Sequence, residues 1–141
     1  MRTLTVLLVE DNVDHATIIT RAIGDFDPLI DVHPVRDGES ATVYLSQESA
    51  PPDLVLLDIN MPGLSGFDVL EHIKGDPRLK AIPVVVLTSS ELPSDITRAY
   101  QLGASGYVSK PTYLQDLRAT LRNVMLYWSA MRRTDAGEHA E

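Results

Sequence analysis

The spacing of apolar residues constrains the fold of this 141-residue chain more than any other feature. Five short apolar runs recur along it, and polar or turn residues follow each of them. Such runs, rich in β-branched residues, are too short for buried helices and are typical of strands covered on both faces. Strands are therefore predicted at residues 3–9, 29–35, 54–57, 84–87 and 107–109.

Between these runs, apolar residues recur three or four positions apart, which predicts amphipathic helices. Glycine, proline and other turn residues follow these patterns and mark helix ends, as at residues 24–28, 51–52 and 75–77. Five helices are expected, around residues 16–23, 41–45, 67–73, 94–102 and 112–128.

The alternation of strands and helices predicts an α/β domain, a doubly wound five-stranded parallel sheet with five helices. The sequence contains no internal repeat and no linker long enough to separate two domains. We expect one domain over residues 1–132, followed by a small, polar and disordered tail at residues 133–141.

Composition excludes several kinds of function. The chain has no cysteine, so disulfides, thiolate metal sites and cysteine nucleophiles are ruled out. Its net charge of -8, without a gathered basic patch, argues against binding to nucleic acid. No apolar run approaches the roughly 20 residues of a membrane span, and the start lacks the pattern of a signal peptide. A cytoplasmic protein is expected.

Polar side chains follow four of the predicted strands. The first strand ends in Glu10 and Asp11, the third in Asp58 and the fourth in Thr88, and Lys110 follows the fifth. Because functional groups of such sheets gather at the carboxyl ends of the strands, these side chains should converge. Two carboxylates about 4 Å apart repel by roughly 4 kcal/mol at an effective dielectric near 20, so three of them require a cation. Carboxylate ligands favour Mg²⁺ and make zinc unsuitable.

With Mg²⁺ bound, Asp58 is a candidate nucleophile towards phosphorus, as carboxylates are in aspartyl-phosphate enzymes. Phosphoryl transfer needs groups that position and neutralise the oxygens of the transferred group. Lys110 supplies a positive charge and Thr88 a hydroxyl for that purpose.

Four motifs, in order and at the expected strand ends, resemble the receiver domain of two-component response regulators. They are Val-Glu-Asp-Asn at residues 9–12, Leu-Asp-Ile-Asn-Met-Pro-Gly-Leu-Ser-Gly at 57–66, Leu-Thr-Ser at 87–89 and Tyr-Val-Ser-Lys-Pro at 107–111. The resemblance covers about residues 3–128. It implies the flavodoxin-like receiver fold and a cytoplasmic phosphorylation switch.

The resemblance also implies a metal site. Glu10 and Asp11 would be the acidic pair that supports Mg²⁺, with Asp58 and the backbone carbonyl of Asn60 as further ligands. Many receivers have aspartate where this chain has Glu10. The longer side chain indicates that Glu10 contacts the metal through water.

The same resemblance assigns the remaining site residues. Asp58 would be the phosphoacceptor, Thr88 and Lys110 would bind the phosphoryl oxygens, and Tyr107 would rotate inward on activation. The implied function is that of a single-domain response regulator that takes a phosphoryl group from a phosphohistidine of a sensor histidine kinase. It catalyses only its own phosphorylation and dephosphorylation. The long helix containing Trp128 is similar to that of stand-alone regulators associated with bacterial phytochromes.

The four histidines show no metal-binding spacing and are expected on the surface. His15 begins a helix beside the acidic pair, on the face where receivers resemble one another in docking their kinases, and could contact the kinase there.

The sequence argues against three other functions. A phosphatase or mutase of the haloacid dehalogenase type would need a general acid two residues after Asp58, where this chain has Asn60. A nucleotide switch would need a phosphate-binding loop after the first strand, and none is present. A binding module that is not phosphorylated should lack some of the site residues, and all are present.

The final helix carries more apolar residues than one face needs. Residues outside its apolar stripe form a surplus near the helix end that we expect to be exposed and to form a homodimer interface. The stripe comprises Leu114, Leu117, Leu121, Val124, Trp128 and Met131, and the surplus lies at Met125, Leu126 and Tyr127, with Trp128 beside it.

Overall fold

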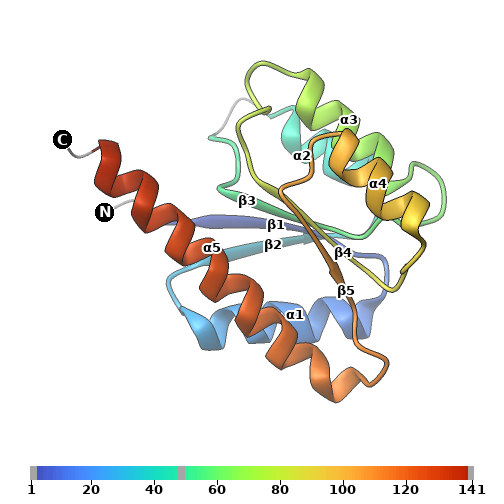
Figure 1. The fold of residues 1–141 in the computed structure, drawn as a ribbon, viewed down its shortest axis with the longest axis horizontal. Coiled ribbons are helices and arrows are strands. Elements are labelled where there is room, and N and C mark those ends of the chain that lie inside the picture. The colour runs from blue at the N-terminus through green and yellow to red at the C-terminus, as the bar shows by residue number, and fades with distance from the viewer. Residues whose placement is uncertain (1–2, 48–49, 140–141) are drawn as a thin grey trace.

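Five parallel strands form one sheet, and helices cover both of its faces (Figure 1). The computed structural model describes residues 3–47 and 50–139, and of residues 133–139 only the backbone. The strands are β1 (Thr5–Val9), β2 (Asp31–Val35), β3 (Leu54–Leu57), β4 (Val84–Thr88) and β5 (Gly106–Ser109). The helices are α1 (Val13–Phe26), α2 (Gly38–Leu45), α3 (Gly66–Gly75), α4 (Pro93–Gln101), the short 3₁₀ helix η1 (Leu114–Asp116) and α5 (Leu117–His139).

The strand order is β2-β1-β3-β4-β5, and every neighbouring pair is parallel. This is the order of flavodoxin-like doubly wound sheets, in which the direction of winding reverses between β1 and β3. The predicted fold class is therefore confirmed.

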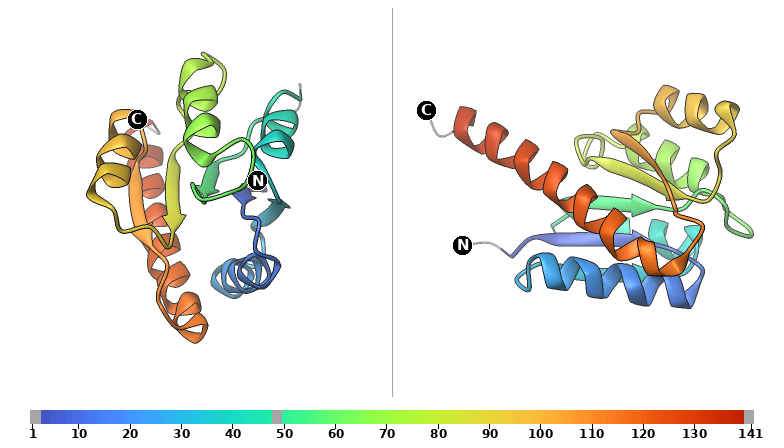
Figure 2. Two further views of the ribbon diagram at one scale, coloured as in Figure 1. Left: turned by 90° about the vertical axis from the view of Figure 1, so that its right-hand side faces the viewer. Right: turned by 60° about the horizontal axis from the view of Figure 1, so that its bottom comes forward.

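The sheet separates two apolar layers, because alternate residues of a strand point to opposite faces. On one face, Val6 and Leu8 of β1 pack with α1 and α5. On the other, Leu7 and Val9 of the same strand pack with α2 and α3. Figure 2 shows α1 and α5 on one side of the sheet and α2, α3 and α4 on the other. Burial on both faces explains why β1 and β3 are continuous apolar runs.

Two helix boundaries differ from the predictions. Gly24 was expected to begin the turn after the first helix, but α1 continues through it to Phe26. A single glycine is tolerated inside a helix when the flanking residues pack well, as Ile23 does here. The last helix was expected from about residue 112, and a separate 3₁₀ turn precedes it instead.

Part of the prediction for the final helix is wrong. Met125 was expected to be exposed, but it is fully buried in the layer shared with α1, and Trp128 is buried beside it. Leu126 and Tyr127 are exposed, as expected, with 47% and 68% of their surface accessible. The apolar face of α5 is broader than a strict stripe because α1 and the sheet both pack against it.

The carboxyl-terminal part of α5 projects past the edge of the sheet (Figure 2). The helix continues to His139, so residues 133–139 have helical backbone. A disordered tail was expected at residues 133–141, so the helical backbone at residues 133–139 differs from that expectation, and residues 140–141 lie outside the described residues. Among the described residues, no helix is both long and apolar enough to cross a membrane.

Candidate functional site

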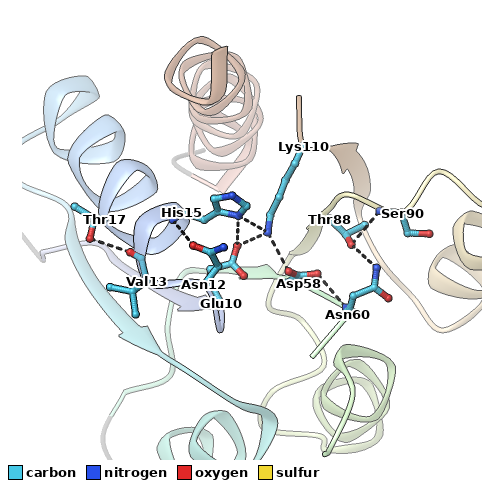
Figure 3. Close-up of polar contacts among 10 residues, drawn as sticks. All are labelled: Glu10, Asn12, Val13, His15, Thr17, Asp58, Asn60, Thr88, Ser90 and Lys110. Atoms are coloured by element: carbon cyan, nitrogen blue, oxygen red, sulfur yellow. Dashed lines mark hydrogen bonds and ion pairs between the residues drawn. The ribbon is translucent and has the colours of Figure 1, made fainter. Parts of the chain in front are cut away.

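The carboxyl edge of the sheet brings together five of the predicted site residues, Glu10, Asp58, Asn60, Thr88 and Lys110 (Figure 3). Asp58 directly follows β3, and its backbone N–H donates to the carbonyl of Val9 at 3.0 Å, which fixes it beside the end of β1. Lys110 follows β5, and its N–H donates to the carbonyl of Thr88 at 2.7 Å. Parallel pairing of the strands thus positions groups that lie far apart in the sequence.

Lys110 links the two sides of this site. Its side chain is 5% exposed, and its Nζ donates to Asp58 Oδ2 at 3.0 Å and also to Glu10 Oε1. Burial by itself would lower the pKa of Lys110, but the contacts with Glu10 and Asp58 outweigh it and the pKa is raised. The lysine is therefore a fixed positive charge against Asp58.

Three carboxylates lie close enough to share a cation. Oxygen atoms of Glu10, Asp11 and Asp58 are all within 4.8 Å of one another. Glu10 and Asp58 are buried, whereas Asp11 is exposed. A cluster of this kind suits a hard divalent ion that keeps several of its waters.

The carboxyl group of Glu10 is buried, and one of its oxygens has no hydrogen-bond donor among the described residues. Burial raises the pKa of its carboxyl to about 7, although the contact with Lys110 opposes this rise. Its second oxygen, Oε2, is buried and accepts no hydrogen bond from any residue that the structure describes. Buried polar atoms are normally satisfied, so an oxygen left over beside two other carboxylates fits a site for a metal ion or its water.

Asn60 and Thr88 lie on the other side of Asp58. The backbone N–H of Asn60 donates to Asp58 Oδ1 at 3.0 Å, and its side-chain amide donates to Thr88 Oγ1 at 3.4 Å. Thr88 is completely buried. The two oxygens of Asp58 therefore face different partners, one the ammonium of Lys110 and the other the backbone of Asn60.

A chain of hydrogen bonds leads from Thr88 to Tyr107. The N–H of Ser90 donates to Thr88 Oγ1 at 3.3 Å, and the hydroxyl of Tyr107 donates to the carbonyl of Ser90 at 2.9 Å. The hydroxyl of Ser90 donates to Asp95 in the first turn of α4 at 2.5 Å. Burial is the largest cause of a raised pKa for the half-buried Tyr107. The site is thus connected to β5 and α4.

Gly66 holds the loop after β3 in place. A Cβ atom at this position would lie 2.4 Å from the carbonyl oxygen of Asp58 and 2.5 Å from the Cα of Ile59. Only glycine allows the start of α3 to approach the backbone of Asp58 so closely. Ser65 and Asp68 form a capping box that fixes the first turn of the same helix.

Sequence reasoning missed three contributions to the site. The side-chain amide of Asn60 and the backbone of Ser90 both contact Thr88, although only the Asn60 carbonyl was considered. The polar run at residues 88–90 was a signal for Ser90. His15 was expected on the surface, but only 27% of its side chain is exposed and it contacts Lys110. Burial is the largest cause of its lowered pKa.

The other histidines differ among themselves. His33 is exposed, as expected, and stacks on Tyr44 with ring centroids 4.4 Å apart. His72 in α3 is half-buried, whereas it was expected on the surface. Its Nε2 is buried and has no hydrogen-bond partner among the described residues. The side chain of His139 lies outside the described part.

Residues 6–122 match the family described as the response regulator receiver domain. One curated relative is the probable methanogenesis regulatory protein FilR2 of Methanothrix harundinacea, 39% identical over 133 residues that cover 92% of this chain and 86% of FilR2. Another is the response regulator Rcp1 of Synechocystis, 35% identical over 128 residues, or 87% of either chain. This chain therefore belongs to the response regulator receiver family.

Solved structures support the same assignment. The phosphorylated cyanobacterial phytochrome response regulator RcpA superposes with a TM-score of 0.87 at 36% identity, covering 92% of this chain and 96% of RcpA. The Mn²⁺-bound form of Rcp1 gives a TM-score of 0.84 at 34% identity, covering 89% of this chain and 94% of Rcp1. The expected resemblance to phytochrome-associated regulators is confirmed as a similarity of sequence and fold.

Proposed function

We propose that this protein is a phosphorylation switch that accepts a phosphoryl group on Asp58 from a phosphohistidine of a sensor histidine kinase. The observation that carries the proposal is the position of Lys110, whose ammonium contacts both Asp58 and Glu10 at the carboxyl edge of the sheet. A carboxylate beside a fixed cation and a buried hydroxyl has the partners that phosphoryl transfer requires.

In this reaction one carboxylate oxygen of Asp58 forms a bond to phosphorus while the bond from phosphorus to the histidine nitrogen of the kinase breaks. The imidazole leaves with the electron pair of that bond. Lys110 and the hydroxyl of Thr88 hold the oxygens of the transferred group. Water later attacks phosphorus and breaks its bond to the Asp58 oxygen, so that inorganic phosphate leaves and the carboxylate is restored. The protein thus catalyses its own phosphorylation and dephosphorylation only.

Glu10, Asp11 and Asp58 would hold a divalent metal, with the Asn60 carbonyl as a further ligand. Mg²⁺ is the metal proposed, and it would neutralise negative charge around the transferred group. The cluster within 4.8 Å and the unpartnered Oε2 of Glu10 support this assignment, as does the Mn²⁺-bound form of Rcp1.

Phosphorylation is proposed to act through the hydrogen bonds from Thr88 to Ser90 and Tyr107. A phosphoryl group adds about -1.5 to -2 charges, which is enough to reorient Thr88 and Lys110. Because Ser90 also contacts Asp95, a shift at Thr88 would alter β5 and the start of α4 together.

The kinase partner is proposed to be a bacterial phytochrome. This proposal rests on the similarity to RcpA, a cyanobacterial phytochrome response regulator. No nucleic acid or membrane partner is proposed.

A second copy of this chain is the other partner proposed. A groove of about 820 Å³ lies between β5 and α5, and exposed Tyr127 and Met131 of α5 and Tyr100 of α4 help to line it. An apolar surface that pairs with itself about a twofold axis would cover these side chains in a homodimer. The same face contains Tyr107, so dimerisation and phosphorylation should be linked.

Binding of beryllofluoride, a phosphoryl mimic, tests the proposed site. Calorimetry should detect binding to the native protein only when Mg²⁺ is present, and Asp58→Asn should abolish it. Asp53→Asn is not a suitable control because Asp53 accepts a hydrogen bond from the backbone of Thr5. Asp14 is exposed in the first turn of α1, so Asp14→Asn is the matched control and should bind beryllofluoride as the native protein does. Unchanged binding in Asp58→Asn would refute the assignment.

A further inference from the structure

His15 lies against the buried lysine of the site. It occupies the first turn of α1, where Asn12 Oδ1 accepts a hydrogen bond from its backbone N–H at 3.1 Å. Its ring nitrogen Nδ1 is 3.1 Å from Lys110 Nζ and 3.5 Å from Glu10 Oε1 (Figure 3). The histidine is therefore held by a capped helix end and touches two groups of the site.

The direction of the contact follows from the chemistry of the lysine. An ammonium has three hydrogens to donate and nothing that accepts. Nδ1 of His15 must then accept from Lys110, which places the ring proton on Nε2. Lys110 donates its other hydrogens to Glu10 and Asp58, so the three hydrogens of the ammonium have three acceptors.

We propose that His15 is a positioning residue for Lys110. Its imidazole accepts one hydrogen bond from the ammonium. This bond keeps Lys110 beside Asp58 both before phosphorylation, when the lysine contacts a carboxylate oxygen, and after it, when the lysine contacts a phosphoryl oxygen. This inference rests on the proposed function of Asp58 and adds a residue to it.

The surroundings of His15 explain why such support is needed. A cavity of about 400 Å³ opens beside Lys110 and is lined by His15, Ser89 and Pro111, among others. Without the imidazole, water could enter from this cavity and compete for the ammonium. An acceptor mounted on a helix limits the positions of Lys110 more than mobile water does, and preorganised donors are the more effective in phosphoryl transfer.

Two substitutions separate the acceptor from the ring. His15→Phe keeps a ring of similar size but has no acceptor, whereas His15→Gln keeps an acceptor at similar reach. Because Lys110 keeps Glu10 and Asp58 as acceptors, His15→Phe should lose only part of the value of a hydrogen bond to a charged group, and phosphorylation by acetyl phosphate should slow about three- to tenfold. His15→Gln should remain within about twofold of the native rate. His72→Phe, at a half-buried histidine of α3, is the matched control and should leave the rate unchanged.

The nitrogen resonance of the Lys110 side chain provides a second readout that does not require phosphorylation. In the unphosphorylated protein it should shift in His15→Phe and return towards its native position in His15→Gln. An unchanged resonance in His15→Phe, or equal rates in His15→Phe and the native protein, would overturn the inference. Failure of the native protein itself to be phosphorylated would instead refute the proposed function, while the resonance would still test the contact.

Discussion

At the scale of single residues, the ionisation of Glu10 couples stability to pH. Its pKa is about 7 in the folded protein, against an ordinary value of 4.5 that holds in the unfolded chain, so between these values the folded state binds more protons. Stability rises with pH only where the unfolded state binds more protons, and here the opposite holds. The folded state should therefore lose stability as pH rises from about 5 to about 8.

Urea unfolding in a chelator tests this prediction. The Glu10→Gln protein should lack this part of the pH dependence. From about pH 5 to about pH 8, the free energy of unfolding of the native protein should therefore fall by about 1 to 3 kcal/mol more than that of Glu10→Gln. Added Mg²⁺ should favour the ionised carboxylate and recover stability at the higher pH. Parallel pH profiles for the two proteins without metal would count against a raised pKa at Glu10.

Lys110 connects the phosphoryl site to the fifth strand. Lys110→Ala should leave binding of beryllofluoride partly intact but reduce the changes that follow it, because the lysine joins Asp58 to the end of β5. Amide chemical shifts of Thr88 and Tyr107 measure those changes, and the exposed Lys80 offers a control in Lys80→Ala. Shifts of native size at both residues in Lys110→Ala would contradict the proposed coupling.

At the scale of elements, the contact of α3 with the loop after β3 depends on Gly66. Gly66→Ala places a methyl group against the backbone of Asp58 and Ile59, and the backbone cannot move aside as a flexible side chain can. The free energy of unfolding should fall by about 1–3 kcal/mol, and beryllofluoride affinity should fall with it.

Gly24→Ala is the matched control for this substitution. Gly24 is also helical, but nothing lies within 4 Å of the position where its Cβ would be. Alanine should therefore stabilise α1 by about 0.5–1 kcal/mol and leave beryllofluoride affinity unchanged. Equal stability of the Gly66→Ala and Gly24→Ala proteins would show that the close backbone approach at Gly66 does not contribute to stability.

The sequence was sufficient to predict the order of the elements and the convergence of Glu10, Asp58, Thr88 and Lys110, because strand ends in a parallel sheet share one edge. It was not sufficient to predict how side chains from different elements meet. His15 and Lys110 are 95 residues apart, and their contact depends on where the start of α1 and the end of β5 lie relative to each other in the folded chain. Met125 was misplaced for the same reason, since the width of the apolar face of α5 depends on its neighbours.

At the scale of the whole molecule, the exposed apolar residues of α5 predict a homodimer. Replacing Leu126 and Tyr127 together by Glu should give a folded monomer, because both side chains are exposed and their loss leaves the core intact. Sedimentation at micromolar concentration measures the change. Val43→Glu, at an exposed site on α2, is the control and should leave the dimer unaffected.

Dimerisation should also respond to phosphorylation. If beryllofluoride tightens the dimer tenfold, about 1.4 kcal/mol, then dimerisation must favour the phosphorylated conformation by the same amount. A native protein that sediments as a monomer both with and without beryllofluoride would rule out the proposed interface.

Intact-mass measurement after incubation with acetyl phosphate shows whether Asp58 accepts a phosphoryl group. With Mg²⁺, the native protein should gain the mass of one phosphoryl group, and it should gain none in the presence of a chelator. The Asp58→Asn protein should gain none under either condition, while Asp14→Asn should behave like the native protein. A phosphoryl group on Asp58→Asn, or none on the native protein with Mg²⁺, would refute Asp58 as the phosphoacceptor.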